Sequence, residues 1–410
     1  MRVVVIGGGV IGLTSAYQLV RDGAEVTLID ARETGRGASE VNAGWVCPAE
    51  SGPVPAPGMI SQALRWMLRR DSPLYVRPSL DPSFLRFMLA MARHCNRSDY
   101  RAGMQALMHL SEGTMEQLDA YREDGLVFEM HADGLLLTFL SEAKLEGHLV
   151  DIDLAESAGL EPEVLRGSAV REREPALAGE VHGGVYYPHE RHLDPVALGR
   201  ALRDRCAALG VALLEGTPLE EVEREGSHVR AIRCGQERLE ADAFLLAAGA
   251  WSGPLAKAFG GNLLVRPGKG YSLDLPSLEL RQPIYLTEAK VAVTPLDGRL
   301  RLAGTMEFGP LDERVDPART AAIGRAPSSF LRGWQVPAEP ELGAGLRPMS
   351  PDGLPLVGRL GDLENAYVST GHAMLGLTLA PSSAAAISGL IVRGEQSAAL
   401  APFAPDRFGR

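Results

Sequence analysis

The pattern of apolar and polar positions is clearest at the start of the chain. The apolar run 1–6 predicts a short buried strand, and apolar positions at helical spacing over 10–20 predict a helix directly after it. A second β-branched run, 25–29, predicts another strand that ends at Asp30. Strand, helix and strand in this order are typical of a βαβ unit in a parallel sheet.

Beyond residue 58 the pattern first predicts helices and then mainly strands. The helices are expected at 59–70, 83–95, 107–124, 141–159, 195–209, 316–333 and 377–393. Asp194 and Pro195 supply a cap and a first-turn proline for the helix at 195–209. The strands are expected at 126–140, 181–187, 212–214, 219–224, 229–234, 241–247, 263–265, 284–287, 291–295, 300–304 and 366–370. The close spacing of the strands between 284 and 304 indicates an antiparallel sheet.

Three glycines between the first strand and the first helix suggest what this βαβ unit binds. Gly7, Gly9 and Gly12 have G-x-G-x-x-G spacing, which permits a tight turn, a close approach of backbone to a pyrophosphate and close packing of helix on strand. The diphosphate would rest on the helix N-terminus, where unpaired N–H groups point. Asp30 can accept both ribose hydroxyls of an adenosine and disfavours a 2′-phosphate. We expect an adenosine dinucleotide other than NADP, with a plain glycine-rich turn as the alternative.

The composition excludes several classes of protein. The 410 residues suffice for two domains, and 45% apolar with 23% charged residues is ordinary for a globular protein. A net charge of −11 argues against an electrostatically driven nucleic-acid binder. The four cysteines lack C-x-x-C spacing, and His189 and His192 have no evident third partner, so we expect neither disulfides nor a metal site.

The pattern contains no evident targeting signal. The first strand begins at residue 2 and leaves no room for a signal peptide, and no apolar stretch reaches the roughly 18 residues of a spanning helix. We therefore expect a cytoplasmic protein. The helices at 59–70 and 83–95 carry Trp, Met and Phe interleaved with Arg, which suits either a core face with a solvated edge or a face on a membrane surface.

Two segments of small residues are compatible with a cofactor without requiring one. N-A-G at 42–44 follows the loop after the second strand, and A-G-A-W-S at 248–252 follows a buried strand. Both allow backbone to pass close to a ring system or a nucleotide. Both suit a surface loop or an ordinary turn equally well.

Six motifs, taken in order, resemble a known family. They are V-V-V-I-G-G-G-V-I-G-L at 3–13, N-A-G at 42–44, L-L-A-A-G-A-W-S at 245–252, G-Y-S-L at 270–273, G-L-R-P-M-S-P-D-G-L-P at 345–355 and T-G-H-A-M-L-G-L-T-L-A-P at 370–381. The set resembles the FAD-dependent D-amino acid dehydrogenases of bacteria, within the superfamily of D-amino acid oxidase, glycine oxidase and sarcosine oxidase. The motifs extend over nearly the whole chain.

The resemblance implies an α/β fold, with a Rossmann-type FAD-binding domain and a discontinuous second α+β substrate domain built on an antiparallel sheet. We expect the FAD-binding domain at 1–100, 183–255 and 336–410, and the substrate-binding domain at 101–182 and 256–335. The cofactor it implies is non-covalent FAD. A helix N-terminus after residue 371 would stabilise the reduced flavin at its pyrimidine end.

By the same resemblance, Asp30 holds the ribose, Leu219 lines the adenine pocket, and the 42–44 loop passes near the isoalloxazine. The full set of expected cofactor residues is Gly7, Gly9, Val10, Ile11, Gly12, Asp30, Ala31, Asn42, Ala43, Gly44, Leu219, Gly249, Trp251, Gly371, His372, Leu375, Gly376 and Leu377. Arg347 is expected to clamp the substrate carboxylate, because the arginine of the same G-L-R-P motif does so in the glycine oxidase branch and a guanidinium fork suits a planar carboxylate. Its alternative is a structural ion pair. Tyr271 is expected to add a hydroxyl to the same carboxylate, with a core tyrosine as the alternative.

The reaction implied is oxidation of the Cα–N bond of a D-amino acid, with D-proline or D-hydroxyproline among the candidates, by hydride transfer to flavin N5 to give an imine. Such a reaction asks mainly for alignment and requires no general base on the enzyme. The electron acceptor would be a quinone, an electron-transfer protein or O2. The alternatives are an O2-using oxidase of glycine, sarcosine or an L-imino acid, and a flavoprotein subunit of a heteromeric dehydrogenase. We expect no nucleic-acid partner, and a place in the cytoplasm or peripherally on the inner face of the membrane.

Overall fold

The computed structural model describes residues 1–66, 72–336, 339–395 and 397–409. Within them, the opening βαβ unit forms as predicted, with β1 (Arg2–Ile6), α1 (Val10–Arg21) and β2 (Glu25–Ile29). These strands join β10 (Ala212–Leu214), β14 (Ala243–Leu246), β21 (Ala366–Thr370) and β20 (Leu356–Arg359) in the sheet order β10-β2-β1-β14-β21-β20. All neighbours in this sheet are parallel except β20 and β21.

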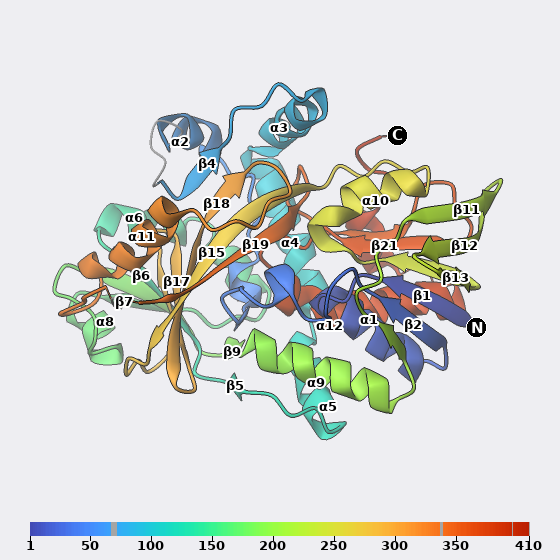
Figure 1. Cartoon of the computed structure of the whole chain (residues 1–410). Coiled ribbons are helices and arrows are strands. Elements are labelled where there is room, and N and C mark those ends of the chain that lie inside the picture. Colours follow the sequence, from blue (N-terminus) through green and yellow to red (C-terminus); the bar gives the residue numbers. More distant parts are fainter. Residues whose placement is uncertain (67–71, 337–338, 396, 410) are drawn as a thin grey trace.

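Both faces of this sheet are covered, which is why its strands are mainly apolar. On one face α1 packs against α9 (Pro195–Ala208) and α12 (Gly376–Ser388), around a core that includes Leu13, Leu198 and Leu379. On the other face lie α10 (Ser252–Ala258) and a small antiparallel sheet of β11 (Glu221–Glu225), β12 (His228–Cys234) and β13 (Glu237–Glu240). Figure 1 shows this layered unit beside the second sheet, with both chain ends on its side of the molecule.

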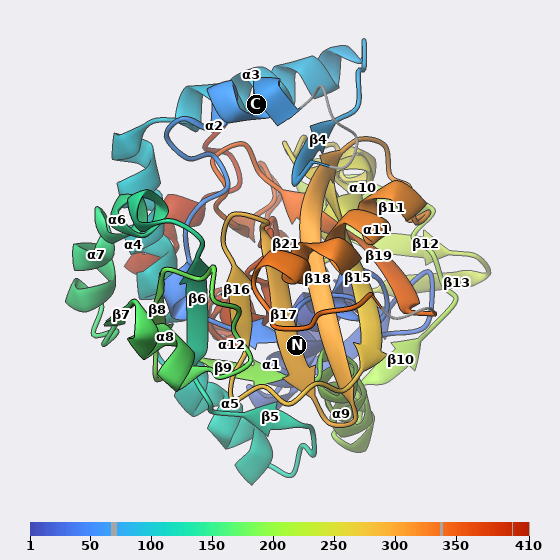
Figure 2. The same ribbon diagram turned by 90° about the vertical axis from the view of Figure 1, so that its left-hand side faces the viewer.

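The second unit is a large, mainly antiparallel sheet. Its order is β19-β15-β18-β17-β16-β6-β8-β7, and β4 pairs with β18 beside this path. The strands are β4 (Leu74–Val76), β6 (Leu135–Phe139), β7 (Glu163–Arg166), β8 (Gly183–Tyr187), β15 (Arg266–Pro276), β16 (Ile284–Leu286), β17 (Val291–Leu296), β18 (Arg299–Phe308) and β19 (Glu341–Met349). α11 (Pro317–Arg325) packs on β15 and β18, and α8 (Ser168–Arg173) contacts β7 and β8 (Figure 2). The α/β fold with an antiparallel substrate sheet is thus confirmed.

The remaining helices border the two units. They are α2 (Met59–Trp66), α3 (Pro82–His94), α4 (Arg97–Ser111), α5 (Thr114–Glu123), α6 (Glu142–Leu149) and α7 (Ile152–Ser157). A short sheet, β3-β9-β5, joins β3 (Trp45–Val46), β9 (Arg191–Leu193) and β5 (Met130–His131). Figure 2 shows α2, α3 and β4 together at one end of the large sheet.

Several predicted boundaries differ from the structure. The helix expected at 107–124 is two helices, α4 and α5, because Gly113 adopts a left-handed φ of 75° between them. The helix expected at 141–159 is likewise divided into α6 and α7, and the strand expected at 263–265 is irregular. Residues 67–70 of the helix expected at 59–70 lie outside the described residues. Three strands, β4, β8 and β19, fall in segments assigned to the FAD-binding domain. They pair with strands of the large sheet and therefore belong to that sheet.

One expectation about apolar stretches also needs correction. By length and composition, Gly376–Arg393 is an 18-residue helical stretch apolar enough to cross a membrane, and 67% of it is buried inside the protein. It packs against α1, α4 and α5, so its apolar character is that of a core helix.

Candidate functional site

The glycine-rich turn leaves room for a phosphate at the start of α1. Gly7 has a φ of 112°, and a Cβ on Gly12 would lie 1.8 Å from the Gly7 carbonyl oxygen, so neither position accepts a side chain. The N-cap residue, Gly9, provides no side-chain cap for the helix. The backbone N–H of Val10 is bound by Ser39 Oγ at 2.9 Å. The next N–H groups of the helix, those of Ile11 and Gly12, have no side-chain partner among the described residues, and a diphosphate needs such groups.

Asp30 is held facing this turn. Its carboxylate accepts hydrogen bonds from the backbone N–H groups of Gly8 at 2.6 Å and Arg32 at 2.7 Å. The carbonyl of Asp30 accepts the N–H of Thr217 at 2.7 Å, which brings the segment leading to Leu219 beside the ribose position. Ala31 is exposed directly after Asp30. The expected ribose and adenine residues thus lie along one edge of the parallel sheet.

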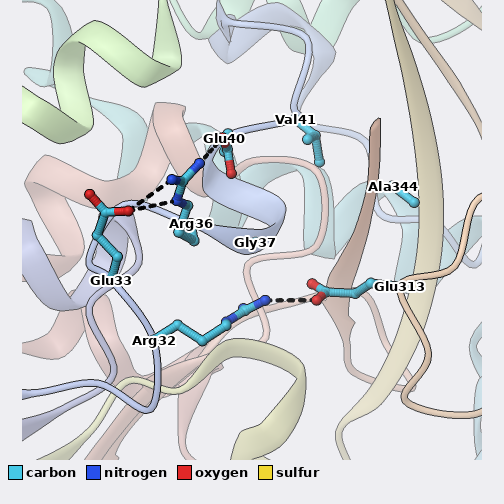
Figure 3. A pocket seen from close by; sticks show the side chains of 8 residues that line it. All are labelled: Arg32, Glu33, Arg36, Gly37, Glu40, Val41, Glu313 and Ala344. Atoms are coloured by element: carbon cyan, nitrogen blue, oxygen red, sulfur yellow. Dashed lines mark hydrogen bonds and ion pairs between the residues drawn. The ribbon is translucent and has the colours of Figure 1, made fainter. Parts of the chain in front are cut away.

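A pocket of about 290 Å³ opens along the loop that follows Asp30, between the two units. It is lined by Arg32, Glu33, Arg36, Gly37, Glu40, Val41, Glu313 and Ala344 (Figure 3). Arg32 crosses it to pair with Glu313 at 2.7 Å, whereas Arg36 pairs with Glu33 and Glu40 on its own loop. This charged pocket lies on the adenosine side of the site.

The 42–44 loop is fastened to the large sheet. The side chain of Asn42 accepts the N–H of Gly44 at 2.7 Å, and the carbonyl of Ala43 accepts the hydroxyl of Thr294 at 2.8 Å. A Cβ on Gly44, whose φ is 79°, would lie 2.3 Å from the Leu193 carbonyl oxygen. Arg301 donates to the carbonyl of Asn42 at 3.2 Å. The 42–44 loop is therefore held in place between the two units and is not a free surface loop.

The turn after β14 is joined to the end of β21. Gly249 has a φ of 54°, and its carbonyl accepts the hydroxyl of Thr370 at 2.9 Å. The ring of Trp251 lies 5.1 Å from the Arg32 guanidinium, an arrangement that permits a cation–π contact.

The turn before α12 forms the other end of the predicted flavin site. Gly371 has a φ of 79°, and Leu375 caps α12 at Gly376 without a side-chain hydrogen bond, so the N–H groups of Gly376 and Leu377 have no side-chain cap. His372 is 2% exposed, and its Nε2 lies 3.0 Å from Ser383 Oγ. Burial lowers the pKa of His372 to about 3, so this imidazole is neutral and fixes the turn. The N–H of Ala373 donates to the Pro348 carbonyl at 3.1 Å, which joins the turn to β19.

Arg347 projects from β19 beside that junction. Its Nη1 donates to the Thr305 carbonyl at 2.8 Å, and the guanidinium lies so close to Gly270 that a Cβ there would be 2.0 Å from Nη1. Burial lowers the pKa of Arg347 to about 10, which still leaves a cation at neutral pH. Among the described residues no carboxylate forms an ion pair with it, so the structural ion pair that the sequence left open is absent from this part of the chain. An unpaired, half-buried guanidinium fits a carboxylate ligand.

The two tyrosines near this strand have different surroundings. Tyr271 is 1% exposed and donates its hydroxyl to Glu307 Oε2 at 2.6 Å, so its proton is already used inside the large sheet. The sequence did not single out Tyr285, which lies on β16 with its ring 5.7 Å from that of Trp45. Burial raises the pKa of its hydroxyl, and the Arg347 guanidinium opposes this rise. Tyr285 reaches this position because β16 pairs with β17, which in turn pairs with β18. No local motif indicates it.

Backbone strain is concentrated around Arg347. The only non-glycine residues with positive φ in the described part of the chain are Lys290, Thr305 and Ala373, at 56°, 58° and 50°. Thr305 supplies the carbonyl that holds Arg347, Ala373 contacts the end of its strand, and the Lys290 carbonyl lies against Gly304. A β-branched residue in this conformation is costly, and such residues persist mainly where function requires them.

These features fit FAD. The glycine turn, the Asp30 carboxylate, the fixed 42–44 loop and the uncapped α12 N-terminus supply, in order, the places for diphosphate, ribose and ring. The Cys47 thiol is buried, which raises its pKa well above its usual range and keeps it protonated, in keeping with non-covalent binding.

The histidines considered in the sequence do not meet. His189 lies near the exposed Glu161, whereas His192 stacks on His131 with ring centroids 4.8 Å apart. His131, Asp133 and His192 place ligand atoms within 4.8 Å of one another, and His189 is not among them.

Comparison with known proteins agrees with this reading. The family model described as FAD dependent oxidoreductase matches residues 2–390. The chain is 33% identical over 418 aligned positions to a D-amino acid dehydrogenase of Rhizorhabdus wittichii, covering 100% of both chains. It is 32% identical to a D-amino acid dehydrogenase of Bradyrhizobium diazoefficiens, covering 100% of this chain and 99% of that one.

Solved structures show the same fold. Glycine oxidase from Geobacillus kaustophilus superposes with a TM-score of 0.78 at 21% identity, covering 99% of each chain. Glycine oxidase from Bacillus cereus gives 0.75 at 23% identity, covering 99% of this chain and 98% of that one. The predicted family and its FAD cofactor are thereby confirmed: the chain belongs to the FAD dependent oxidoreductase family that includes the D-amino acid dehydrogenases.

Proposed function

We propose that this enzyme oxidises the Cα–N bond of a D-amino acid to an imine. The observation that carries the proposal is Arg347, a half-buried cation without a carboxylate partner among the described residues, beside the turn that leads into α12. The relatives named D-amino acid dehydrogenase at about one-third identity support the D-configuration. D-Proline and D-hydroxyproline are the first substrates to try.

The chain's own residues supply binding and alignment. Arg347 binds the substrate carboxylate through the donors that Thr305 leaves free, and Gly270 makes the space in which the guanidinium lies. Bound FAD supplies the acceptor for the hydride that leaves Cα. Gly7, Gly9 and Gly12 would hold its diphosphate, Asp30 its ribose, and the α12 N-terminus its pyrimidine end. Fixing the substrate at its carboxylate aims Cα–H at the acceptor, which is the main task of the protein in such a reaction.

Anaerobic flavin reduction tests the proposal. We expect D-amino acids to bleach the visible absorbance of the purified holoenzyme and their L-enantiomers to leave it unchanged. Bleaching by glycine, sarcosine or an L-imino acid, without any D-amino acid, would move the enzyme to another branch of its family.

The electron acceptor is proposed to be a quinone or an electron-transfer protein. Oxygen uptake at the rate of flavin reduction would instead identify an oxidase. A single chain that turns over with an artificial dye would count against a subunit that works only in a heteromeric complex.

We further propose that the protein is located in the cytoplasm and contacts the membrane peripherally through α3. Phe84, Phe87 and Met91 face the core, whereas Leu85 and Leu89 are 46% and 65% exposed on the outer side. Exposed leucines beside arginines are typical of interfacial helices. Loss of co-sedimentation with anionic lipid vesicles in a Leu85→Glu/Leu89→Glu variant is the expected result, and equal sedimentation of both proteins would contradict it.

A further inference from the structure

The segment after the 42–44 loop places a glutamate near the start of α12. Residues 48–50 form a single 3₁₀ turn that ends at Glu50. The N–H of Cys47 donates to Thr378 Oγ1 in the first turn of α12 at 3.0 Å, and the N–H of Ala49 donates to Glu190 Oε1 at 3.1 Å. Glu50 is thus fixed between the start of α12 and the β8–β9 turn.

The Glu50 carboxylate has no partner in the described part of the chain. It is half-buried, and no described side chain or N–H group forms a hydrogen bond or ion pair with it. Burial raises its pKa to about 7, and the Lys290 ammonium acts in the opposite direction. Holding a carboxylate in such a place without a partner is costly, and a cationic ligand would relieve the cost.

Glu50 and Arg347 act on the same tyrosine. Burial raises the pKa of the Tyr285 hydroxyl; the Glu50 carboxylate adds to this rise, and the Arg347 guanidinium opposes it. Trp45 packs on the Tyr285 ring with centroids 5.7 Å apart, and Trp45 itself is fixed by donating to Thr294 Oγ1 at 2.8 Å. A positive and a negative group thus both influence one tyrosine, whose ring packs on Trp45 directly after the 42–44 loop. An amino acid carries the complementary pair, a carboxylate and an ammonium.

We propose that Glu50 is the counter-charge for an ammonium group of the bound substrate, opposite the carboxylate clamp of Arg347. This inference rests on the proposed function, because it takes the ligand to be an amino acid. The ammonium is either the one on Cα or the one at the end of a basic side chain. Glu50 is a binding residue in this assignment: an ammonium on Cα gives up one proton to solvent before the hydride leaves, and Glu50 takes no part in the hydride step.

Kinetics with a dye acceptor test it on holoenzyme with Glu50→Gln. D-Alanine is compared with propionate, an inhibitor of the same shape that lacks the ammonium. If Glu50 binds the ammonium on Cα, we expect the variant to raise the KM for D-alanine about tenfold or more, the usual effect of losing a charged hydrogen bond; if it binds a side-chain ammonium, the KM for D-lysine rises instead. In both cases the Ki for propionate should stay the same or fall. Glu50→Asp should recover part of the loss, and the FAD content should equal that of the wild type.

Glu190→Gln is the matched control, because it removes a neighbouring buried carboxyl but keeps an oxygen for the Ala49 N–H. Glu190→Gln should leave the KM for D-alanine and the Ki for propionate within about twofold of their wild-type values. The other groups that face Glu50 are Cys47, Tyr100, Tyr187, Tyr285 and Lys290. Burial holds the thiol and the three phenols neutral near pH 7, so the titration of Glu190 is the one that must be distinguished from that of Glu50. In wild type and in Glu190→Gln, the preference for D-alanine over propionate should fall below about pH 7, whereas in Glu50→Gln it should be flat.

D-Lysine distinguishes the two sources of the ammonium. If Glu50→Gln affects D-alanine and D-lysine equally, the group on Cα is bound; if it affects D-lysine alone, the side-chain group is bound. Equal weakening of D-alanine, D-lysine and propionate, or no change in any of them, overturns the proposal. If glycine reduces the flavin and D-alanine does not, the proposed preference for D-amino acids is wrong. The role of Glu50 is then tested by the same comparison, with glycine as the substrate and acetate as the inhibitor that lacks the ammonium.

Discussion

Arg347 differs from the other buried arginines in what surrounds its charge. Arg301 pairs with Asp274 at 2.6 Å and Arg407 with Asp352 at 2.7 Å, whereas Arg347 meets a carbonyl and a glycine. We therefore expect Arg347→Ala to raise the KM for the substrate by about a hundredfold, the loss of a bidentate charged contact, with normal FAD content. Arg347→Lys should recover little, because an ammonium cannot form the fork.

The control for this prediction is Arg205→Ala. Arg205 pairs with Asp124 at 3.0 Å on the α9 side, so its loss should affect thermal stability and leave KM unchanged. Steady-state kinetics and flavin absorbance measure both variants. An unchanged KM in Arg347→Ala would contradict the clamp.

Glu190 gives a prediction for pH and stability. Burial and the nearby Glu50 raise its pKa from 4.5 to about 8, and its Oε2 has no hydrogen-bond partner among the described residues. A folded-state pKa above the unfolded value favours folding below about pH 4.5, and this contribution is lost as the pH rises through 8. Glu190→Gln, which never ionises, should therefore gain stability relative to wild type as the pH rises across that range.

Thermal unfolding of the FAD-saturated proteins at several pH values measures the difference. The two melting temperatures should be closest at about pH 4.5 and should separate towards about pH 9. A difference in melting temperature that does not vary with pH would contradict the raised pKa of Glu190.

At the scale of elements, the position of the Arg347 guanidinium on the paired strands β15 and β19 depends on Gly270. Its backbone lies opposite Gly345 in the register, and the Arg347 guanidinium occupies the space of the missing side chain. Gly270→Ala should displace the guanidinium and raise KM much as Arg347→Ala does, with FAD retained. Gly179→Ala, where an added Cβ meets nothing within 4 Å, is the control and should leave KM unchanged. Normal KM in Gly270→Ala would mean that the clamp tolerates the shift.

Local sequence predicted those elements whose signals are local. The first βαβ unit has its periodicity and its glycines within thirty residues, and α9 has its cap in the Asp194–Pro195 pair, with Asp194 accepting the N–H of Val196 at 2.9 Å. The division of α4 from α5 was missed because Gly113 interrupts an apolar pattern that continues on both sides. The same reasoning explains the site: Arg347 was found through a motif, whereas Tyr285 and Glu50 acquire their roles from strands far apart in the sequence.

At the scale of the whole molecule, the predicted FAD site lies along the contact between the two units. Arg32 reaches Glu313 across the pocket, Trp45 reaches Thr294, and Arg301 reaches the carbonyl of Glu40 at 2.8 Å. All three links involve residues 32–45, the segment that leaves the nucleotide-binding strand and passes the expected ring position. Binding of FAD should therefore stabilise both units together, because a ligand that binds only the folded state adds its binding free energy to stability.

Gly12→Ala tests this link between cofactor and stability. Alanine ordinarily strengthens a helix relative to glycine by about 1 kcal/mol, but a Cβ on Gly12 would lie 1.8 Å from the Gly7 carbonyl oxygen and must distort the diphosphate turn. We expect a colourless protein with a lowered melting temperature that added FAD does not restore. Gly147→Ala in α6, where the added Cβ meets nothing within 4 Å, is the matched control and should stay yellow and at least as stable. A yellow Gly12→Ala protein with wild-type stability would show that the turn can relax, and that the close approach of Gly12 to Gly7 is not needed for FAD.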